Sequence, residues 1–414
     1  MNPEQPNGAD RGPRADQQTN PDESALAVGA DAFVDAGAGL EIAVVGAGAV
    51  GATVAYDLAR RGADVSLYDR NGIASGSSGR AAGVCYDAFA DDLDAEIGRE
   101  SIERFRQLSG DDTFPFTECP YVWLARDGDD RRAEQIRDDV ARMQEAGVVA
   151  VEMDGEEVGD RFESLRTDDV AVAGVAGGAG YTDPGRYTAC MAAAASGVGA
   201  DLHPETSVAV ELDPPRIVER ASGRTREFDA VVAAAGAHTR RLLADAGVDL
   251  AMKPYRVQAM TASGAYVEPI CYDATDDFYV RPHPDGLLAG NGTELVEADP
   301  DEWQRRANEG FADALADRIG DRLPDVEPTV DRAWAGLCTA TPDGDPLVGA
   351  VADGVYVATG FQGHGFMRAP AIAERLAEQV VGGSGIDAFD PTRVDGDASF
   401  EIVAGMSIEP DATG

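Results

Sequence analysis

The sequence predicts an α/β protein with a parallel sheet and a second, α+β domain. A short apolar run, Ile42 to Val45, is typical of a strand buried on both faces. The pattern G-x-G-x-x-G follows at Gly46, Gly48 and Gly51, and apolar residues then recur at helical spacing. A second strand closes at Asp69. This order of strand, glycine turn, helix and strand predicts a Rossmann-like dinucleotide-binding domain.

Each residue type in this unit suits a bound dinucleotide. Gly46 allows a tight turn, Gly48 lets the backbone approach a pyrophosphate closely, and Gly51 lets the helix pack against the strand. Asp69 stands where a carboxylate can accept hydrogen bonds from ribose hydroxyls. The pattern alone does not separate NAD from FAD. The cofactor-binding residues predicted in this unit are Gly46, Gly48, Ala49, Val50, Gly51, Asp69 and Arg70.

Length and charge limit the classes of function. A chain of 414 residues is long enough for two or three domains. Its formal net charge is −41, from 34 basic and 75 acidic residues, and Lys253 is the one lysine. Nucleic-acid binding is not expected, because it needs clustered basic residues. Salt screens such a charge, which indicates a very salty cytoplasm such as that of a halophilic archaeon. An acidic protein of an ordinary organism is the alternative.

The cysteines and the apolar runs bear on location. The five cysteines are scattered and match no zinc or redox spacing, which indicates reduced intracellular thiols and no metal site. The chain has no apolar run of about 18 residues, and its N-terminus has no apolar signal core. We therefore expect a cytoplasmic protein without a membrane span.

The remaining residues divide into interleaved blocks. Residues 1–38 are rich in Pro, Asn, Asp and Gly, and we expect them to form a disordered tail. The expected domains are a discontinuous dinucleotide-binding domain over 39–98, 172–249 and 331–390, a substrate domain over 99–171 and 250–330, and a C-terminal extension over 391–414.

Helical patterns occur in both domains. Residues 92–109 and 129–145 have the apolar spacing of amphipathic helices. Asp183 is placed to cap a further helix that has Pro184 at its first position. These helices are expected to cover the faces of the sheets.

Two later segments complete the pattern. A helix is expected within Asp299 to Leu323, with Trp303 on its buried stripe. A loop containing Gly360, Gly363 and Gly365 precedes a helix that we expect to begin near Arg368 to Pro370. A helix N-terminus presents free amides and a partial positive charge, so this loop is a second candidate for contact with a bound group.

Four elements in this order resemble the FAD-dependent D-amino-acid oxidase superfamily, which includes glycine oxidase, sarcosine oxidase and dehydrogenase, and dimethylglycine dehydrogenase. They are G-x-G-x-x-G, then ASGSSGRAAG after the acid, then FDAVVAAAGAHTRRLL, and finally G-x-x-G-H-G, spread over residues 41–383. The resemblance implies FAD rather than NAD. It also implies a Rossmann-like FAD-binding domain with a mixed-sheet substrate domain, the two-domain architecture of the glutathione-reductase type.

The resemblance assigns the other cofactor contacts. It implies that the second element runs along the FAD pyrophosphate and ribityl chain, and that the backbone of Val208 lies against the adenine. The last element faces the flavin, where a helix N-terminus stabilises the negative charge of the reduced ring. The implied residues are Ser77, Ser78, Gly79, Arg80, Ala81, Ala82, Val208, Ala235, Gly236, Gly360, Gly363, His364, Gly365, Phe366 and Met367.

The same resemblance implies the chemistry, which the flavin carries. A hydride leaves the carbon next to an amine and passes to flavin N5, so the expected substrate is an amino acid or an N-methylated amino acid of glycine, sarcosine or D-amino-acid type. Arg281 or Arg256 could bind a substrate carboxylate, because a guanidinium pairs bidentately with it. Tyr255 or Tyr279 could donate a hydroxyl, and His364 could face the substrate or the flavin. Of these, His364, Arg281 and Tyr255 are the predicted substrate-orienting residues.

Two departures from the family pattern affect the prediction. In several relatives an Arg holds the substrate carboxylate, and this chain has Cys338 at that position. The Cys that anchors the flavin covalently in sarcosine oxidases corresponds to Gly336, so we expect non-covalent FAD. Lys253 does not fall at the position of the lysine that activates oxygen in sarcosine oxidases. This favours a dehydrogenase that passes electrons to a carrier protein or quinone rather than to oxygen. The alternatives are a 2-hydroxy-acid dehydrogenase like the L-2-hydroxyglutarate enzymes, and a non-catalytic FAD-binding subunit of a multi-subunit dehydrogenase.

Overall fold

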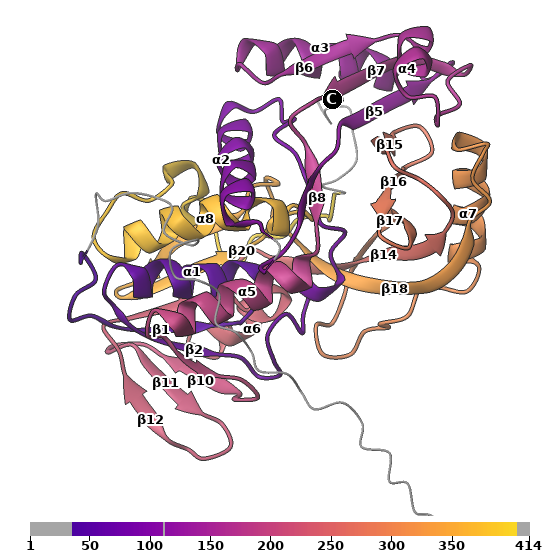
Figure 1. Cartoon of the computed structure of the whole chain (residues 1–414). Helices are drawn as coiled ribbons and strands as arrows, with labels where there is room; N and C mark the ends of the chain where they lie inside the picture. Colours follow the sequence, from indigo (N-terminus) through magenta and orange to yellow (C-terminus); the bar gives the residue numbers. More distant parts are fainter. Residues whose placement is uncertain (1–34, 111, 404–414) are drawn as a thin grey trace, which may run out of the picture.

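The computed structural model describes residues 35–110 and 112–403, which form two large sheets with helices packed on them (Figure 1). Residues 1–34 of the expected tail and residues 404–414 of the expected C-terminal extension lie outside the described residues. Within the described part of the chain, no helix is long and apolar enough to cross a membrane.

A six-stranded sheet carries the glycine turn. All neighbouring strands in it are parallel except β19, which runs antiparallel to β20. β1 is buried on both faces, as its apolar run predicted: Ile42 and Val44 face one core, and Ala43 and Val45 face another. In spatial order the strands are β19 (Leu347–Ala352), β20 (Val355–Thr359), β13 (Ala230–Ala233), β1 (Glu41–Val45), β2 (Asp64–Tyr68) and β9 (Asp201–His203).

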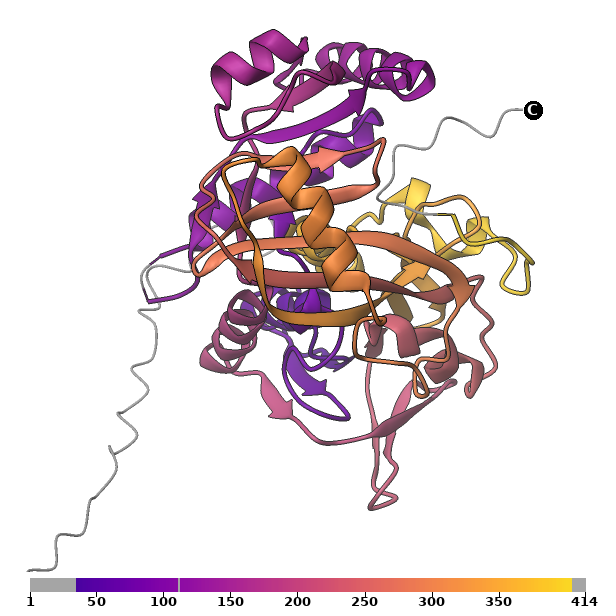
Figure 2. The ribbon, with the colours of Figure 1, turned by 90° about the vertical axis from the view of Figure 1, so that its right-hand side faces the viewer.

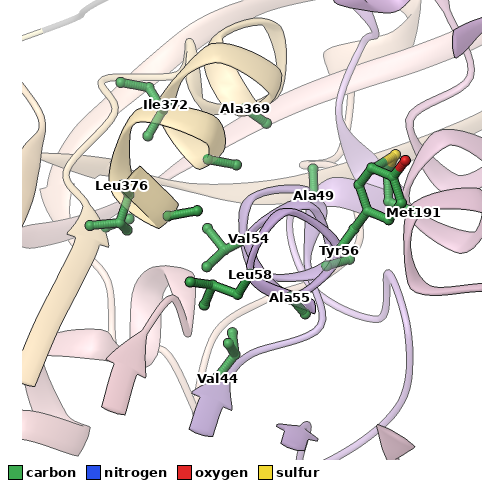
Figure 3. Packing of buried hydrophobic residues seen from close by; sticks show 14 of the residues in the cluster. Val44, Ala49, Val54, Ala55, Tyr56, Leu58, Met191, Ala369, Ile372 and Leu376 are labelled. Atoms are coloured by element: carbon green, nitrogen blue, oxygen red, sulfur yellow. The ribbon is translucent and has the colours of Figure 1, made fainter. Parts of the chain in front are cut away.

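Helices cover one face of this sheet and a β-ribbon covers the other. Figure 3 shows Leu58 of the first helix between Val44 of β1 and Leu376 of the last helix. On the opposite face, Ile217 and Phe228 of the ribbon region share a core with β1. The helices are α1 (Ala49–Arg60), α2 (Asp92–Leu108), α5 (Pro184–Gly197) and α8 (Gly365–Val380), and the ribbon is β10 (Val208–Glu211), β11 (Arg216–Glu219) and β12 (Thr225–Glu227), with the short α6 (Thr239–Ala244) nearby.

An eight-stranded mixed sheet forms the second part. Its strands in spatial order are β18 (Thr329–Ala340), β14 (Lys253–Ser263), β17 (Gly286–Glu297), β16 (Phe278–His283), β15 (Ile270–Asp273), β5 (Tyr121–Arg126), β7 (Val170–Ala176) and β6 (Ala150–Met153). Helix α7 (Phe311–Arg322) crosses one face (Figure 2), where α4 (Gly155–Arg161) joins the same core, and α3 (Asp130–Glu145) packs on the other face. A small sheet of β3 (Val84–Cys85), β8 (Gly180–Thr182) and β4 (Phe116–Glu118) lies between the two parts.

Several local predictions are confirmed. The amphipathic helices expected at 92–109 and 129–145 correspond to α2 and α3. Asp183 caps α5, because its carboxylate accepts a hydrogen bond from the Arg186 amide at 2.9 Å, and Pro184 is the first helical residue. The five cysteines are free thiols.

Two helix predictions were wrong in their bounds. The helix expected over Asp299 to Leu323 begins only at Phe311, after Gly310 with a φ of 78°. The preceding residues are largely polar and exposed, so they have no apolar stripe to bury, and Trp303 lines a cavity instead of the core. The last helix begins at Gly365 rather than near Arg368.

The sheet pairing divides the chain differently from the expected domain boundaries. The boundaries at 98/99, 171/172 and 330/331 fall inside α2, β7 and β18. α2 packs against α8 and shares the core of α1, so it sits with the dinucleotide sheet. β7 and β18 both belong to the eight-stranded sheet.

Candidate active site

A cavity of about 1030 Å³ is lined by both large sheets. One end is formed by the glycine turn and the start of α1, and another by β5, β15 and β16. A space of this size is at the upper end of ordinary ligand pockets. It brings together most residues that the sequence assigned to the cofactor, and several that it did not.

The glycines of the turn are required by close backbone packing within the fold. A Cβ on Gly46, whose φ is 112°, would lie 2.3 Å from the carbonyl oxygen of Ala234. A Cβ on Gly51 would lie 1.9 Å from the Gly46 carbonyl oxygen, so Gly51 supports the turn from below and does not line the cavity. Gly48, Ala49 and Val50 do line it, where the amides of the first helical turn have no intrahelical acceptors.

Asp69 has a second role in the turn. Its Oδ2 accepts a hydrogen bond from the Ala47 amide at 2.9 Å, and its Oδ1 accepts one from the Asn71 amide at 2.8 Å. The carboxylate therefore fixes the glycine turn as well as lining the cavity. A carboxylate oxygen can accept more than one hydrogen bond, so Asp69 retains acceptor capacity for ribose hydroxyls.

The loop after β2 lies along the start of α1. The Ser78 hydroxyl accepts a hydrogen bond from the Ala49 amide at 2.9 Å, and the Ser77 hydroxyl donates to the Leu337 carbonyl of β18 at 2.6 Å. Arg80 also lines the cavity, and its carbonyl accepts from the Trp334 indole at 3.0 Å. The loop thus connects the two sheets. Of the residues implied here, Ser77, Ser78, Arg80, Ala81 and Ala82 line the cavity, whereas Gly79 packs against Ala74.

Beside the dinucleotide sheet, residues from both parts of the molecule form a polar cluster at the cavity. Val208, Ala235 and Gly236 line the cavity, as the resemblance implied. Beside them Arg70 pairs with Asp301 at 2.8 Å and lies 2.7 Å from Nε2 of His238. The ion pair with Arg70 lowers the pKa of Asp301. Residue Asp301 belongs to the segment before α7, so this segment is tied across the rim of the cavity.

The C-terminal glycine loop divides into lining and supporting residues. Gly363, Gly365, Phe366 and Met367 line the cavity at the start of α8. The Cβ that Gly360 lacks would lie 2.4 Å from Thr341 Cγ2, so Gly360 packs against the neighbouring turn. His364, the last residue of the loop before α8, is buried behind these lining residues.

His364 is next to the cavity wall through its contact with Tyr86. Its Nε2 lies 3.1 Å from the hydroxyl of Tyr86, which does line the cavity. Burial, with a smaller contribution from Arg368, lowers the pKa of His364 to about 3, so the imidazole is neutral at physiological pH. His364 therefore contacts the cavity-lining Tyr86 and does not itself line the cavity.

The two other predicted substrate-orienting residues do not reach the cavity. Arg281 is 4% exposed, and its guanidinium donates to the carbonyls of Ala82 at 2.6 Å and Pro282 at 2.5 Å. Burial lowers the pKa of Arg281. Tyr255 is fully buried and pairs with Cys338 across β14 and β18. The sequence could not show that the Arg281 guanidinium is held by backbone carbonyls, one of them 199 positions away, or that Tyr255 is buried between strands.

Arg256, the other candidate for a carboxylate, is also committed. Its guanidinium pairs with Glu294 and donates to the carbonyls of Gln304 at 2.8 Å and Arg306 at 2.7 Å. It is 6% exposed. Its contacts hold the segment before α7 in place, where Trp303 lines the cavity.

Sequence reasoning missed most of the cavity wall that the eight-stranded sheet supplies. Tyr86, Tyr121, Tyr272 and Asp277 line it together with Tyr279, which the sequence had raised only as a hydroxyl donor. We call these five residues the tyrosine wall. They come from separate segments, and isolated tyrosines in strands resemble ordinary core residues. The weak signal available was aromatic residues at alternating positions of strands in the substrate block.

The cavity-lining residues fit FAD. First-turn amides and serine hydroxyls suit a pyrophosphate, Asp69 suits a ribose, and the cavity continues past the C-terminal loop to the tyrosine wall. Within the described residues no cluster of His, Cys, Asp and Glu could hold a metal ion. Cys338 also lines the cavity, where burial raises the pKa of its thiol to about 12, and the expectation of non-covalent FAD remains a prediction.

Two known proteins with similar sequences are named as oxidases. The chain is 29% identical over 387 residues to the 4-methylaminobutanoate oxidase (formaldehyde-forming) of Paenarthrobacter nicotinovorans, covering 85% of this chain but only 44% of that protein. It is 24% identical over 360 residues to the glycine oxidase of Bacillus licheniformis, covering 82% of this chain and 92% of that protein. The chain thus spans less than half of the first relative and nearly all of the second.

Solved structures agree on the fold. L-proline dehydrogenase from P. horikoshii superposes with a TM-score of 0.78 at 26% identity, covering 86% of this chain and 98% of that one. Glycine oxidase from Geobacillus kaustophilus gives a TM-score of 0.76 at 23% identity, covering 86% and 100%. The predicted two-domain α/β architecture is therefore confirmed. The model of the DAO family, described as FAD dependent oxidoreductase, matches residues 41–379, and the chain belongs to this family of FAD-dependent enzymes.

Proposed function

We propose that the protein oxidises the CH–NH bond of an amino acid or an N-methylated amino acid and delivers the electrons as a dehydrogenase. The observation that carries this proposal is the single cavity that joins the phosphate-binding turn to the tyrosine wall of the eight-stranded sheet. Bound FAD supplies the hydride acceptor, at flavin N5. The names of the relatives, which act on methylamino acids and glycine, support this substrate class.

The chain's own residues hold and orient both partners. The first turn of α1 and Ser78 suit the pyrophosphate, and the start of α8 directs a partial positive charge towards the cavity. Tyr86 is held by His364 and presents its ring and hydroxyl to the cavity. These groups position a substrate for hydride loss without an acid–base pair.

The electron acceptor is proposed to be a carrier protein or quinone rather than oxygen. Lys253, the one lysine of the chain, does not line the cavity. Its ammonium group contacts the carbonyl of Phe400 and lies 4.6 Å from the centre of that ring. No lysine ammonium therefore faces the space above the cofactor-binding residues.

Anaerobic reduction of the purified holoenzyme in high salt tests the proposal. A panel should contain glycine, sarcosine, D-amino acids, other N-methylated amines and 2-hydroxy acids, with the flavin absorbance recorded after each addition. Bleaching by an amine supports the proposal, whereas bleaching only by a 2-hydroxy acid overturns it. No bleaching by any compound would favour a non-catalytic FAD-binding subunit. Fast, stoichiometric peroxide formation in air would refute the dehydrogenase assignment alone.

A further inference from the structure

We infer that residues 299–303, which precede α7, form an arch over the adenosine end of the FAD site, and that ion pairs at its apex set how fast FAD enters and leaves. The sequence assigned no residue of this segment to the cofactor. Pro300, Asp301 and Trp303 nevertheless line the cavity. The arch acts on the cofactor, so its role does not depend on which substrate the enzyme oxidises.

Both ends of the arch are fixed to the eight-stranded sheet. Before it, the amide of Ala298 donates a hydrogen bond to the carbonyl of Pro254 in β14 at 2.8 Å. After it, the carbonyl of Gln304 accepts a hydrogen bond from the guanidinium of Arg256, also in β14, at 2.8 Å. Arg256 is buried. The arch therefore belongs structurally to the second part of the molecule, and only its apex reaches the dinucleotide part.

The apex is bound to the dinucleotide part by ion pairs. Oδ1 of Asp301 lies 2.8 Å from Arg70, and Oδ2 of Asp301 lies 2.7 Å from Arg241. Arg241 also pairs with Asp299 at 2.7 Å. Oδ1 of Asp299 accepts hydrogen bonds from the amides of Asp301 and Glu302 at 2.8 Å and 3.2 Å, which fixes the turn at the apex. We call the three ion pairs the latch.

The neighbours of the arch show which part of the cavity it covers. Arg70 directly follows Asp69, the residue that suits a ribose, and both line the cavity. Near the other end of the arch, the guanidinium carbon of Arg80 lies 5.9 Å from the centre of the Trp303 ring. Arg80 belongs to the loop that lies along the start of α1, where a pyrophosphate fits. The arch thus spans the adenosine and pyrophosphate end, and FAD passes it when the latch opens.

The latch differs from the two ends of the arch in its response to salt. Between 40% and 50% of each of its four side chains is exposed. Single exposed pairs are weak, but these three pairs share Asp301 and Arg241 and so form a network on one short segment. Dissolved ions screen such exposed charges, whereas hydrogen bonds to backbone carbonyls hold the ends. The latch should therefore open more often as the KCl concentration rises.

The charge of FAD allows the latch to be distinguished from a direct electrostatic effect. FAD carries a negatively charged diphosphate, and Asp299 and Asp301 are negative as well. If these carboxylates only repelled FAD, their removal would slow its release. If they form the latch, their removal speeds its release. The latch joins two parts of the protein and not the protein to FAD, so opening it should speed uptake too.

Stopped-flow measurement of FAD release and uptake by the full chain tests the inference. Asp299→Asn/Asp301→Asn removes both charges of the arch but leaves an oxygen on each side chain to accept the hydrogen bonds of the turn. Release from the holoenzyme on dilution, followed by FAD fluorescence, should be about tenfold faster, and uptake by the flavin-free chain should also be faster. Higher KCl should speed release several-fold in the unchanged enzyme and have little effect in the variant. All rates are measured at KCl concentrations at which the melting temperature shows folded protein.

The matched control removes two carboxylates from exposed positions of α7. Asp317→Asn/Asp321→Asn changes the net charge equally, and neither residue lines the cavity. It should leave both rates and their salt dependence unchanged. If the variant of the arch fails to fold, Asp301→Asn alone gives the same test, because Asp301 takes part in two of the three pairs.

A further variant shows whether the arginine acts through the latch. Arg241→Gln should speed release in the unchanged chain and add little when Asp299 and Asp301 are already replaced. Full additivity would mean that Arg241 binds FAD itself and would overturn the inference. So would slower or unchanged release in the variant of the arch, or faster release combined with slower uptake. A complete absence of FAD release from the unchanged enzyme would also overturn it, because a latch could then set no rate.

Discussion

The hydroxyl of Tyr86 lies 3.1 Å from Nε2 of His364, and this contact joins the tyrosine wall to the loop that begins α8. Tyr86 precedes α2 in the sequence, whereas His364 lies near the end of the chain. The rings of Tyr86 and Phe89 enclose the imidazole edge to face, with centroids 6.2 Å and 5.5 Å from it. The C-terminal loop is thus coupled to the wall by a buried, neutral imidazole.

The first prediction concerns how the lowered pKa of His364 changes the stability of the protein at acid pH. The unfolded chain binds a proton at His364 near pH 6.5, whereas the folded protein does so only near pH 3. The unfolded state therefore binds more protons below pH 6.5, and stability falls as the pH drops towards 3. His364→Gln removes this titration. Urea unfolding at pH 6.5 and 5.5 should show a loss that is about 1 kcal/mol smaller in the variant. Equal losses would mean that His364 is protonated in the folded protein.

The second prediction concerns the glycine turn. Gly51→Ala places a Cβ about 1.9 Å from the Gly46 carbonyl oxygen, so the backbone must shift. We expect a cost of about 3 kcal/mol in stability and loss of bound FAD. Gly72→Ala is the control, because a Cβ there meets no atom within 4 Å. The ratio of flavin to polypeptide after purification measures the effect. Full FAD content in Gly51→Ala would contradict the geometry of the turn.

The sequence was most informative where function depends on a local pattern. Gly46 and Gly48 could be assigned because tight turns and phosphate contacts require glycine at fixed spacing, whereas Ser78 followed from the family resemblance. The helix cap at Asp183 was predictable for the same reason. In each case the residues that act together are close in the chain.

The tyrosine-wall end of the cavity could not be predicted in this way. Its wall combines Tyr86 and Asp277 with residues of β5, β15 and β16, and these strands meet only through sheet pairing. Arg281 was a reasonable carboxylate ligand by residue type, but its partner is the carbonyl of Ala82, a contact that spans 199 positions. Trp303 was assigned to a helix stripe, whereas polar contacts such as that of Asp301 with Arg70 hold this segment across the rim. Long-range pairing of this kind has no local sequence signal.

The third prediction follows from the position of Arg281. Because its guanidinium holds the Ala82 carbonyl in the loop after β2, Arg281→Gln should weaken FAD binding. Loss of these charge-assisted hydrogen bonds should cost about 2 kcal/mol. The fluorescence of released flavin on dilution measures this loss. KM should change by the same factor for amines with and without a carboxylate. A selective rise of KM for carboxylate substrates would show instead that Arg281 binds the substrate.

The control for this variant is another arginine. Arg306→Gln removes an equal charge from an exposed residue that does not line the cavity and makes no ion pair among the described residues. It should leave FAD retention and KM unchanged. If both variants lose FAD equally, the effect comes from net charge and not from the contact with Ala82.

The last prediction concerns salt. A net charge of −41 opposes the compact state, and the opposition weakens as ions screen it. Between about 0.1 M and 1 M KCl the Debye length falls from roughly 10 Å to roughly 3 Å, so the melting temperature should rise steeply over this range. Exposed pairs such as Arg241 with Asp299 at 2.7 Å lose strength in the same range, but solvent already screens such pairs, so they contribute little to stability. Relief of the repulsion among the excess carboxylates therefore outweighs the weakening of these pairs. A melting temperature that is flat or falls with KCl would refute the expectation that the chain is adapted to high salt. Sucrose at equal osmolality serves as the control because it adds no screening ions.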